Sequence, residues 1–123
     1  MQVSARQLAF ATELFEGLGE VRVRRMFGGA GVYAHDVMFA LIDDDVIFIK
    51  VDDVLKQDLA AEGSRPWIYT AAKGPRAGIA EETSYWSLPE DALDDPDAAC
   101  DWGRRALAAA IASRAPKPRK PRR

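Results

Sequence analysis

The order of apolar and polar positions predicts a helix and a strand at the start of the chain. Ser4 and Gln7 have the spacing of a capping box, and apolar residues then recur at helical intervals. We expect a helix over residues 5–16. Apolar and charged residues alternate over residues 21–24, as in a half-buried strand.

Three short apolar segments then predict a β-meander with strands at residues 31–34, 37–42 and 46–50. The connections, residues 35–36 and 43–45, are too short for a parallel crossover, so the strands are expected to pair antiparallel. The middle strand is apolar on both faces. It is therefore expected to lie centrally and to be covered on both sides, by helices or by a second subunit.

The second half of the chain predicts two helices that flank a pair of strands. One helix begins after Asp52, and the last begins at the Asp95-Pro96 pair, where a side-chain cap precedes a first-turn proline. Strands at 67–69 and 84–88 enclose a flexible loop at 71–83. The expected fold class is α+β, with two layers in which helices pack on one antiparallel sheet.

Charge is unevenly distributed. The chain has 17 basic and 19 acidic residues, but six of the basic ones lie in the last ten positions, so the remainder has 11 basic residues and a net charge of −8. We expect one domain over 1–113 and a proline-rich, disordered tail over 114–123. Such a tail attracts nucleic acid nonspecifically and in a salt-sensitive way. Its candidate contacts beyond Arg114 are Lys117, Arg119, Lys120, Arg122 and Arg123.

Few residue types suited to catalysis are present. The single cysteine, Cys100, excludes an internal disulfide, and the single histidine, His35, falls in a predicted turn without an associated nucleophile. The three carboxylates at 43–45 are poorly placed to converge on one metal ion. No apolar run approaches the length of a membrane span. We expect a cytoplasmic protein without cofactor or metal, and not an enzyme.

A glycine-rich segment follows the first strand. It lacks the Lys-Ser/Thr pair of a phosphate-binding loop, so we interpret its glycines as permitting a bulge or tight bend between two strands. The residues of this structural motif are Met26, Phe27, Gly28, Gly29 and Gly31.

Arg22, Arg24 and Arg25 form the densest basic cluster of the acidic domain. One interpretation is a solvated strand face whose cations pair with Glu20 or with residues 43–45. The other is a contact for an anion or a protein partner, because guanidinium groups bind carboxylates and phosphates bidentately. An alternative of another class is a small-molecule or anion pocket, or a weak enzyme site, near Arg24, Arg25 and His35.

Five aromatic residues could form a base-stacking platform, but such platforms are interleaved with cations and these segments have few. Packing in the core or an interface is the favoured interpretation, with Trp86 facing outward. The five residues are Trp67, Tyr69, Tyr85, Trp86 and Trp102.

Several segments together resemble the N-terminal domain of the TfoX/Sxy family of competence regulators. These segments are residues 25–33, 38–42, 47–52, 85–89 and 102–107. The resemblance implies a two-layer fold similar to that of secretion chaperones. It also implies relatives that activate competence genes together with the cAMP receptor protein, and it supplies no catalytic residue.

Full-length relatives of that family have a second, C-terminal domain with a DNA-binding-type region, which is expected to be missing here. The expected function is therefore that of a single-domain regulatory or adaptor protein. It would bind a protein partner through its sheet or a sheet edge, with a homodimer as one form.

Overall fold

The computed structural model describes residues 3–26 and 28–114 of the chain. The N-terminal elements are α1 (Ala5–Leu14), a short 3-10 helix η1 (Glu16–Leu18), and strands β1 (Val21–Met26), β2 (Gly29–Ala34), β3 (Val37–Asp43) and β4 (Val46–Lys50). The remaining elements are α2 (Asp53–Ala61), β5 (Pro66–Thr70), β6 (Ala80–Ser87), a 3-10 helix η2 (Glu90–Ala92) and α3 (Pro96–Arg114).

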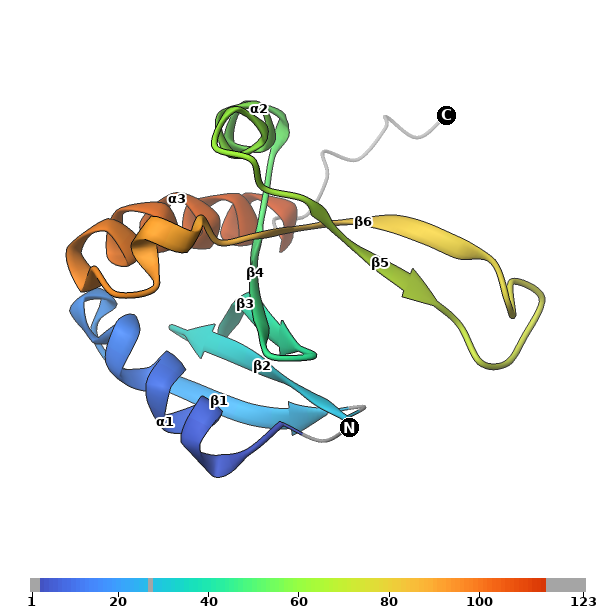
Figure 1. Ribbon diagram of the computed structural model, residues 1–123, viewed down its shortest axis with the longest axis horizontal. Coiled ribbons are helices and arrows are strands. Elements are labelled where there is room, and N and C mark those ends of the chain that lie inside the picture. Colours follow the sequence, from blue (N-terminus) through green and yellow to red (C-terminus); the bar gives the residue numbers. More distant parts are fainter. Residues whose placement is uncertain (1–2, 27, 115–123) are drawn as a thin grey trace, which may run out of the picture.

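The six strands form one antiparallel sheet in the order β1-β2-β3-β4-β6-β5. Helices α1, α2 and α3 all contribute to one hydrophobic core on one face of this sheet (Figure 1). Its fully buried large side chains are Phe15, Val32, Phe39, Ile49, Leu55 and Leu59. The predicted α+β class and the two-layer arrangement are confirmed.

Helix starts were predictable because each has a local cap. Ser4 and Gln7 form the reciprocal hydrogen bonds of a capping box. The Asp52 carboxylate accepts from the Leu55 amide at 2.8 Å, and the Asp95 carboxylate accepts from the Ala98 amide at 3.2 Å. The end of α1 was less predictable, since α1 ends at Leu14, two residues before the expected stop, and η1 follows from Glu16.

A β-bulge in β3 explains how a strand with apolar residues throughout serves two different faces. In the pairing of β2 with β3, Val32 lies opposite Ala40 and Tyr33 opposite Met38, so Phe39 is the extra residue. Phe39 turns into the helix-covered core, where its ring meets that of Phe15 edge-on at 5.2 Å. Helices cover only one face of this strand, so of the two predicted kinds of cover for its other face only a second subunit stays a prediction.

The glycine-rich segment makes both a turn and a close approach. Gly28 has a φ of +83° in the connection between β1 and β2, a conformation that glycine adopts at little cost. Gly29 lies against the backbone of β3, where an added Cβ would come within 2.2 Å of the Ile42 carbonyl oxygen. The predicted tight bend is present; Phe27 lies outside the described residues.

Both meander turns are two-residue connections with positive φ throughout. His35 and Asp36 have φ values of 52° and 62°, and Asp44 and Asp45 have values of 49° and 67°. Such values identify type I′ turns, whose twist matches that of the flanking strands. The second turn is therefore one residue shorter than predicted, and Asp43 belongs to β3.

Replacing Asp45 by glycine is expected to stabilise the protein by about 0.5 kcal/mol, because glycine removes the cost of a left-handed backbone. Urea denaturation would measure this change in the free energy of unfolding. Asp45→Ala is the matched control and should destabilise, since alanine removes the same charge but tolerates the turn poorly. Equal effects of the two substitutions would contradict the turn's role.

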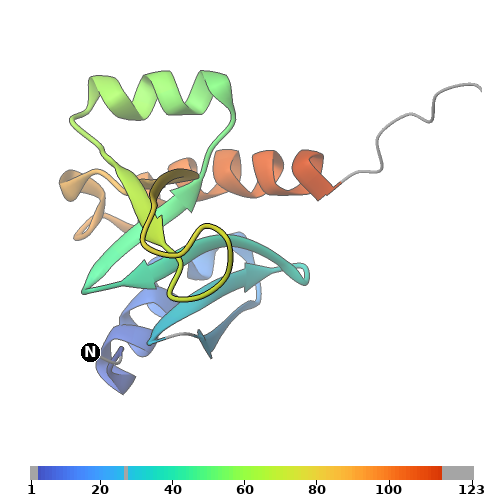
Figure 2. The same ribbon diagram turned by 90° about the vertical axis from the view of Figure 1, so that its right-hand side faces the viewer.

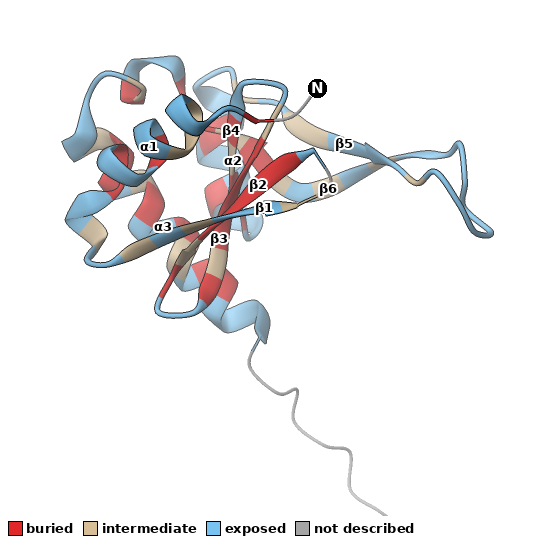
Figure 3. Ribbon diagram, turned by 90° about the horizontal axis from the view of Figure 1, so that it is seen from below, coloured by how far each residue is buried: buried red, intermediate tan, exposed pale blue. Residues whose placement is uncertain are grey.

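The pair β5 and β6 projects from the body as a two-stranded arm, defined here as residues 66–84 (Figures 1 and 3). β6 begins at Ala80, so the loop predicted over 71–83 was too long. Glu81, Glu82 and Thr83, which ended the predicted loop, lie in β6 and are polar because the arm is exposed on both sides. The outward orientation predicted for Trp86 was also wrong: Trp86 lies in the part of β6 that pairs with β4 and is 8% exposed.

The C-terminal helix extends through Arg114, the first residue of the predicted tail, and the other tail residues lie outside the described part of the chain. Cys100 is buried, with its thiol 3.5 Å from the Leu14 carbonyl oxygen. Among the described residues, no helix combines the length and apolar character needed to cross a membrane.

Candidate partner-binding face

The face of the sheet opposite the helices, called here the open face, is not covered by any helix in the views of Figures 1 and 2. Strand alternation and register place on it a set of aromatic, sulfur-containing and basic side chains around the buried, aliphatic Leu41. They are Arg22, Arg24, Met26, Tyr33, Met38, Leu41, Phe48, Lys50, Trp67, Tyr69 and Tyr85.

Gly31 lies beneath the centre of this set. A Cβ added there would lie 2.7 Å from the sulfur of Met38 and 3.1 Å from both the sulfur of Met26 and the Tyr33 ring. The missing side chain lets these three groups lie over β2. Methionine adapts its shape to varied contacts, which suits a surface that another molecule covers.

Aromatic rings continue across the open face from β4 to the arm. The Phe48 and Trp67 ring centres are 6.4 Å apart, and those of Trp67 and Tyr69 are 5.6 Å apart. The Trp67 indole N–H donates to the Asp43 carboxylate at 3.0 Å, which holds the arm against the end of β3. Between the arm and the β2–β3 part of the sheet lies a groove of about 260 Å³.

Two cations of the open face lie on tyrosine rings. The Arg24 guanidinium is 6.0 Å from the centre of the Tyr33 ring, and the Lys50 ammonium is 5.4 Å from that of Tyr85. The Lys50 ammonium also donates to the Ser84 hydroxyl at 2.5 Å. The aromatic segments themselves have few cations, but neighbouring strands supply them.

The two tyrosines are close enough to influence each other. Burial raises the pKa of the Tyr85 hydroxyl above its usual value, and the neighbouring Tyr33 raises it further. Tyr85 is therefore a neutral hydrogen-bond donor over the whole physiological pH range.

The predicted arginine cluster is divided by strand alternation. Arg22 pairs at 2.6 Å with Asp36, and not with Glu20 or residues 43–45. Arg24 lies on the open face, whereas the Arg25 guanidinium donates to the backbone carbonyl of Val3 and fixes the start of the chain. Arg24 and Arg25 thus do not converge.

His35 occupies an exposed turn position and lines neither of the two cavities described here. Tyr33 and Lys50 were not predicted as site residues, although each occupies a position of the strand pattern that points away from the buried residues. Continuing the alternation of Arg22 and Arg24 across the meander would have found them.

The arm has three of the seven exposed large apolar residues in the described part of the chain. Ile68, Tyr69 and Ile79 are 50%, 45% and 46% exposed. β5 is also an edge strand, so one side of its backbone has no neighbouring strand within the described sheet. Unpaired edges of this kind accept an additional strand from another chain.

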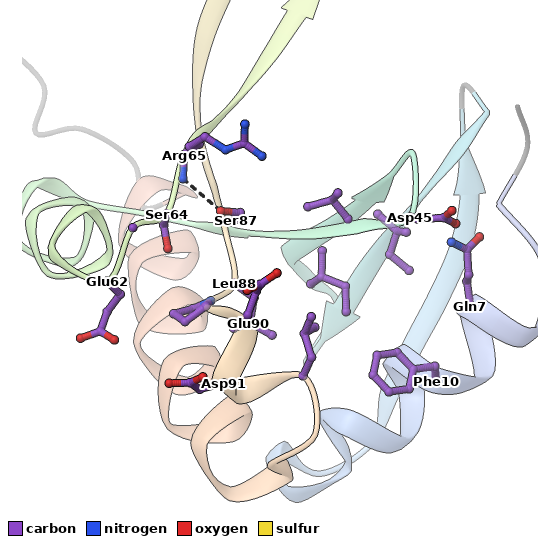
Figure 4. Close-up of a pocket in the computed structure, with 16 residues that line it drawn as sticks. Gln7, Phe10, Asp45, Glu62, Ser64, Arg65, Ser87, Leu88, Glu90 and Asp91 are labelled. Carbon is purple, nitrogen blue, oxygen red and sulfur yellow. Dashed lines mark hydrogen bonds between the residues drawn. The ribbon is translucent and has the colours of Figure 1, made fainter.

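A second cavity, of about 620 Å³, lies between α1, the β3–β4 turn, the α2–β5 connection and η2 (Figure 4). Its lining includes four carboxylates, Asp45, Glu62, Glu90 and Asp91, but only one guanidinium, that of Arg65. This charge repels anions. The cavity therefore does not supply the anion pocket considered as an alternative from the sequence.

A family model gives independent information on the chain. The model of the TfoX N-terminal domain matches residues 13–110, which include every strand of the sheet and most of the helical cover. No curated protein matches the sequence.

Proposed function

The chain belongs to the TfoX N-terminal domain family, and from that premise we propose that it is a regulatory or adaptor protein acting by protein–protein contact, not by catalysis. The processes it would serve are transcriptional or competence regulation in the cytoplasm. The open face and the arm would form the contact surface.

The observation that supports this proposal is the composition of the open face. One face of the sheet is covered by helices, while the other presents methionine and aromatic side chains that continue onto an exposed arm. Most of these side chains are half-buried and Tyr69 is exposed. A contiguous apolar patch is uncommon on soluble proteins and marks interaction sites. Tyrosine and tryptophan are also the residues that most often dominate binding energy at interfaces.

Two further contacts belong to the proposal. A second copy of the chain could occupy the same face, giving a homodimer. The tail cations, Lys117 to Arg123, would add weak, nonspecific attraction to nucleic acid. The small-molecule alternative is less well supported, because the larger cavity is acidic and Arg24 and Arg25 lie on opposite faces of β1.

The contact surface can be tested by Tyr69→Asp. We expect retention of the cellular partner on the immobilised protein to fall on the order of thirtyfold, the effect of removing an interface anchor worth about 2 kcal/mol. Retention is measured from lysate of cells that naturally express the protein. Nuclease treatment and two salt concentrations separate protein from nucleic-acid partners.

Ile111→Asp is the matched control, because Ile111 is a similarly exposed apolar residue, 48%, on α3. It should leave retention unchanged. Equal loss with both variants, or no loss with either, would reject the open face as the contact surface. The molar mass of the isolated protein in solution identifies a second copy as the partner.

A further inference from the structure

Lys50 is one of seven cations in the described part of the chain that form no ion pair. The described residues form five ion pairs, which involve Arg22, Lys56, Arg76, Arg104 and Arg105. The other six are exposed, whereas Lys50 is half-buried and lies within a strand. A partly desolvated ammonium group without a counter-charge is unfavourable unless it serves another purpose.

The hydrogen-bonding capacity of Lys50 is also incompletely used. An ammonium group has three N–H donors, and Lys50 donates to the Ser84 hydroxyl within the described structure. The Tyr85 ring lies under the cation and keeps it on the open face. An acceptor arriving from outside would find further donors available.

A donor from the neighbouring strand lies beside Lys50. Lys50 pairs with Tyr85 in the register of β4 with β6, so the Tyr85 side chain lies beside it on the same face. Arg24 and Tyr33 belong to β1 and β2, and β1 lies three strand positions from β4, so that pair lies farther along the open face. An ammonium group beside a neutral hydroxyl donor matches the single negative charge and two oxygens of a carboxylate.

We propose that Lys50, together with Tyr85, binds a carboxylate side chain in an extended, otherwise apolar segment of the protein partner. This inference rests on the proposed function and specifies the chemistry that the open face recognises. The apolar neighbours of the carboxylate would lie on Met38 and in the groove walled by Trp67 and Tyr69.

Charge favours an acidic peptide over nucleic acid as the occupant. Without the six C-terminal cations the chain has a net charge of −8, which repels a polyanion at long range. A single carboxylate among apolar residues meets much less repulsion and gains the local contacts. Phosphate groups also lack the apolar neighbours that Met26, Met38 and the aromatic rings would cover.

The test uses two acetylated, amidated heptapeptides of leucine and alanine around one central residue, which is glutamate in the first and glutamine in the second. Each is titrated into the full chain, and binding is followed through the backbone amide resonances of Lys50 and Tyr85. We expect the glutamate peptide to bind on the order of tenfold more tightly than the glutamine peptide. Lys50→Gln should abolish that difference.

Lys73→Gln is the matched control, because Lys73 lies in the exposed loop of the arm and also forms none of the five ion pairs. It should leave the tenfold preference intact. The inference is overturned by equal affinity for the two peptides, by absence of binding, or by equal effects of the two lysine substitutions. Tighter binding of oligothymidylate at the same resonances would overturn it in favour of nucleic acid.

These outcomes are separable from failure of the proposed function. If Tyr69→Asp abolishes retention of the cellular partner while Lys50→Gln leaves the peptide preference unchanged, the open face binds a protein without reading a carboxylate. If Tyr69→Asp has no effect, the proposed surface itself is wrong.

Discussion

Gly29→Ala is expected to lower the free energy of unfolding by about 3 kcal/mol or more, a large share of the roughly 5 to 15 kcal/mol typical of a domain. The added Cβ would lie 2.2 Å from the Ile42 carbonyl oxygen. That oxygen belongs to the backbone of β3, so relief requires β2 and β3 to separate where Ala30 pairs with Ile42. Urea denaturation followed by circular dichroism measures the loss.

Gly74→Ala is the control that separates steric overlap from backbone strain. Gly74 has a φ of +92° but nothing within 4 Å of an added Cβ. Its substitution should cost only about 1 to 2 kcal/mol, the penalty of a left-handed alanine. If Gly29→Ala costs no more than Gly74→Ala, the close approach of β2 to β3 is not the reason for glycine at position 29.

Gly28 and Gly29 also differ in how well their roles could be predicted from the sequence. The glycine-rich motif predicted a tight bend, and Gly28 provides it through positive φ. Sequence alone could not distinguish Gly28 from Gly29, because the clash at Gly29 comes from a carbonyl group 13 residues away along the chain. The positive φ of Gly28 follows from the local sequence, whereas the space available at Gly29 is set by the strand that pairs with it.

The helix caps could likewise be predicted from the sequence because they depend on local contacts. Ser4, Asp52 and Asp95 were predictable because each cap contacts residues within three positions. The outward orientation predicted for Trp86 failed because its position in the sheet depends on pairing with β4 instead of on its own segment.

The candidate site was only partly predictable for a related reason. Arg24 was identified from its basic neighbours, but Tyr33, Lys50 and Tyr85 join it through registers that span β1 to β6. Cations and aromatic rings that look separate in the sequence alternate in space. The sequence therefore indicated fewer cations among the aromatic residues than the open face has.

The bulge in β3 connects this site to the core. Because Phe39 is an extra residue, both Phe39 and Ala40 are fully buried, while Met38 and Leu41 lie on the open face. A regular strand would send Phe39 and Ala40 to opposite faces. The same irregularity thus fills the core and sets which side chains a partner meets.

Phe39→Ala is expected to lower the free energy of unfolding by about 3 to 5 kcal/mol, since it removes a fully buried ring and leaves a cavity in the core beside Phe15. Phe15 is equally buried and meets Phe39 edge-on at 5.2 Å, so part of the loss belongs to the pair. A double-mutant cycle with Phe15→Ala isolates this part, expected at about 0.5 to 1.5 kcal/mol. Chemical denaturation of the four proteins provides the values.

Met38→Ala is the comparison that tests the bulge itself. Met38 precedes Phe39 but lies on the open face and is only half-buried, so its removal should cost clearly less than that of Phe39. Similar losses at both positions would mean that β3 does not divide its side chains as the register indicates. A zero coupling between Phe15 and Phe39 would reject their contact as the reason for the bulge.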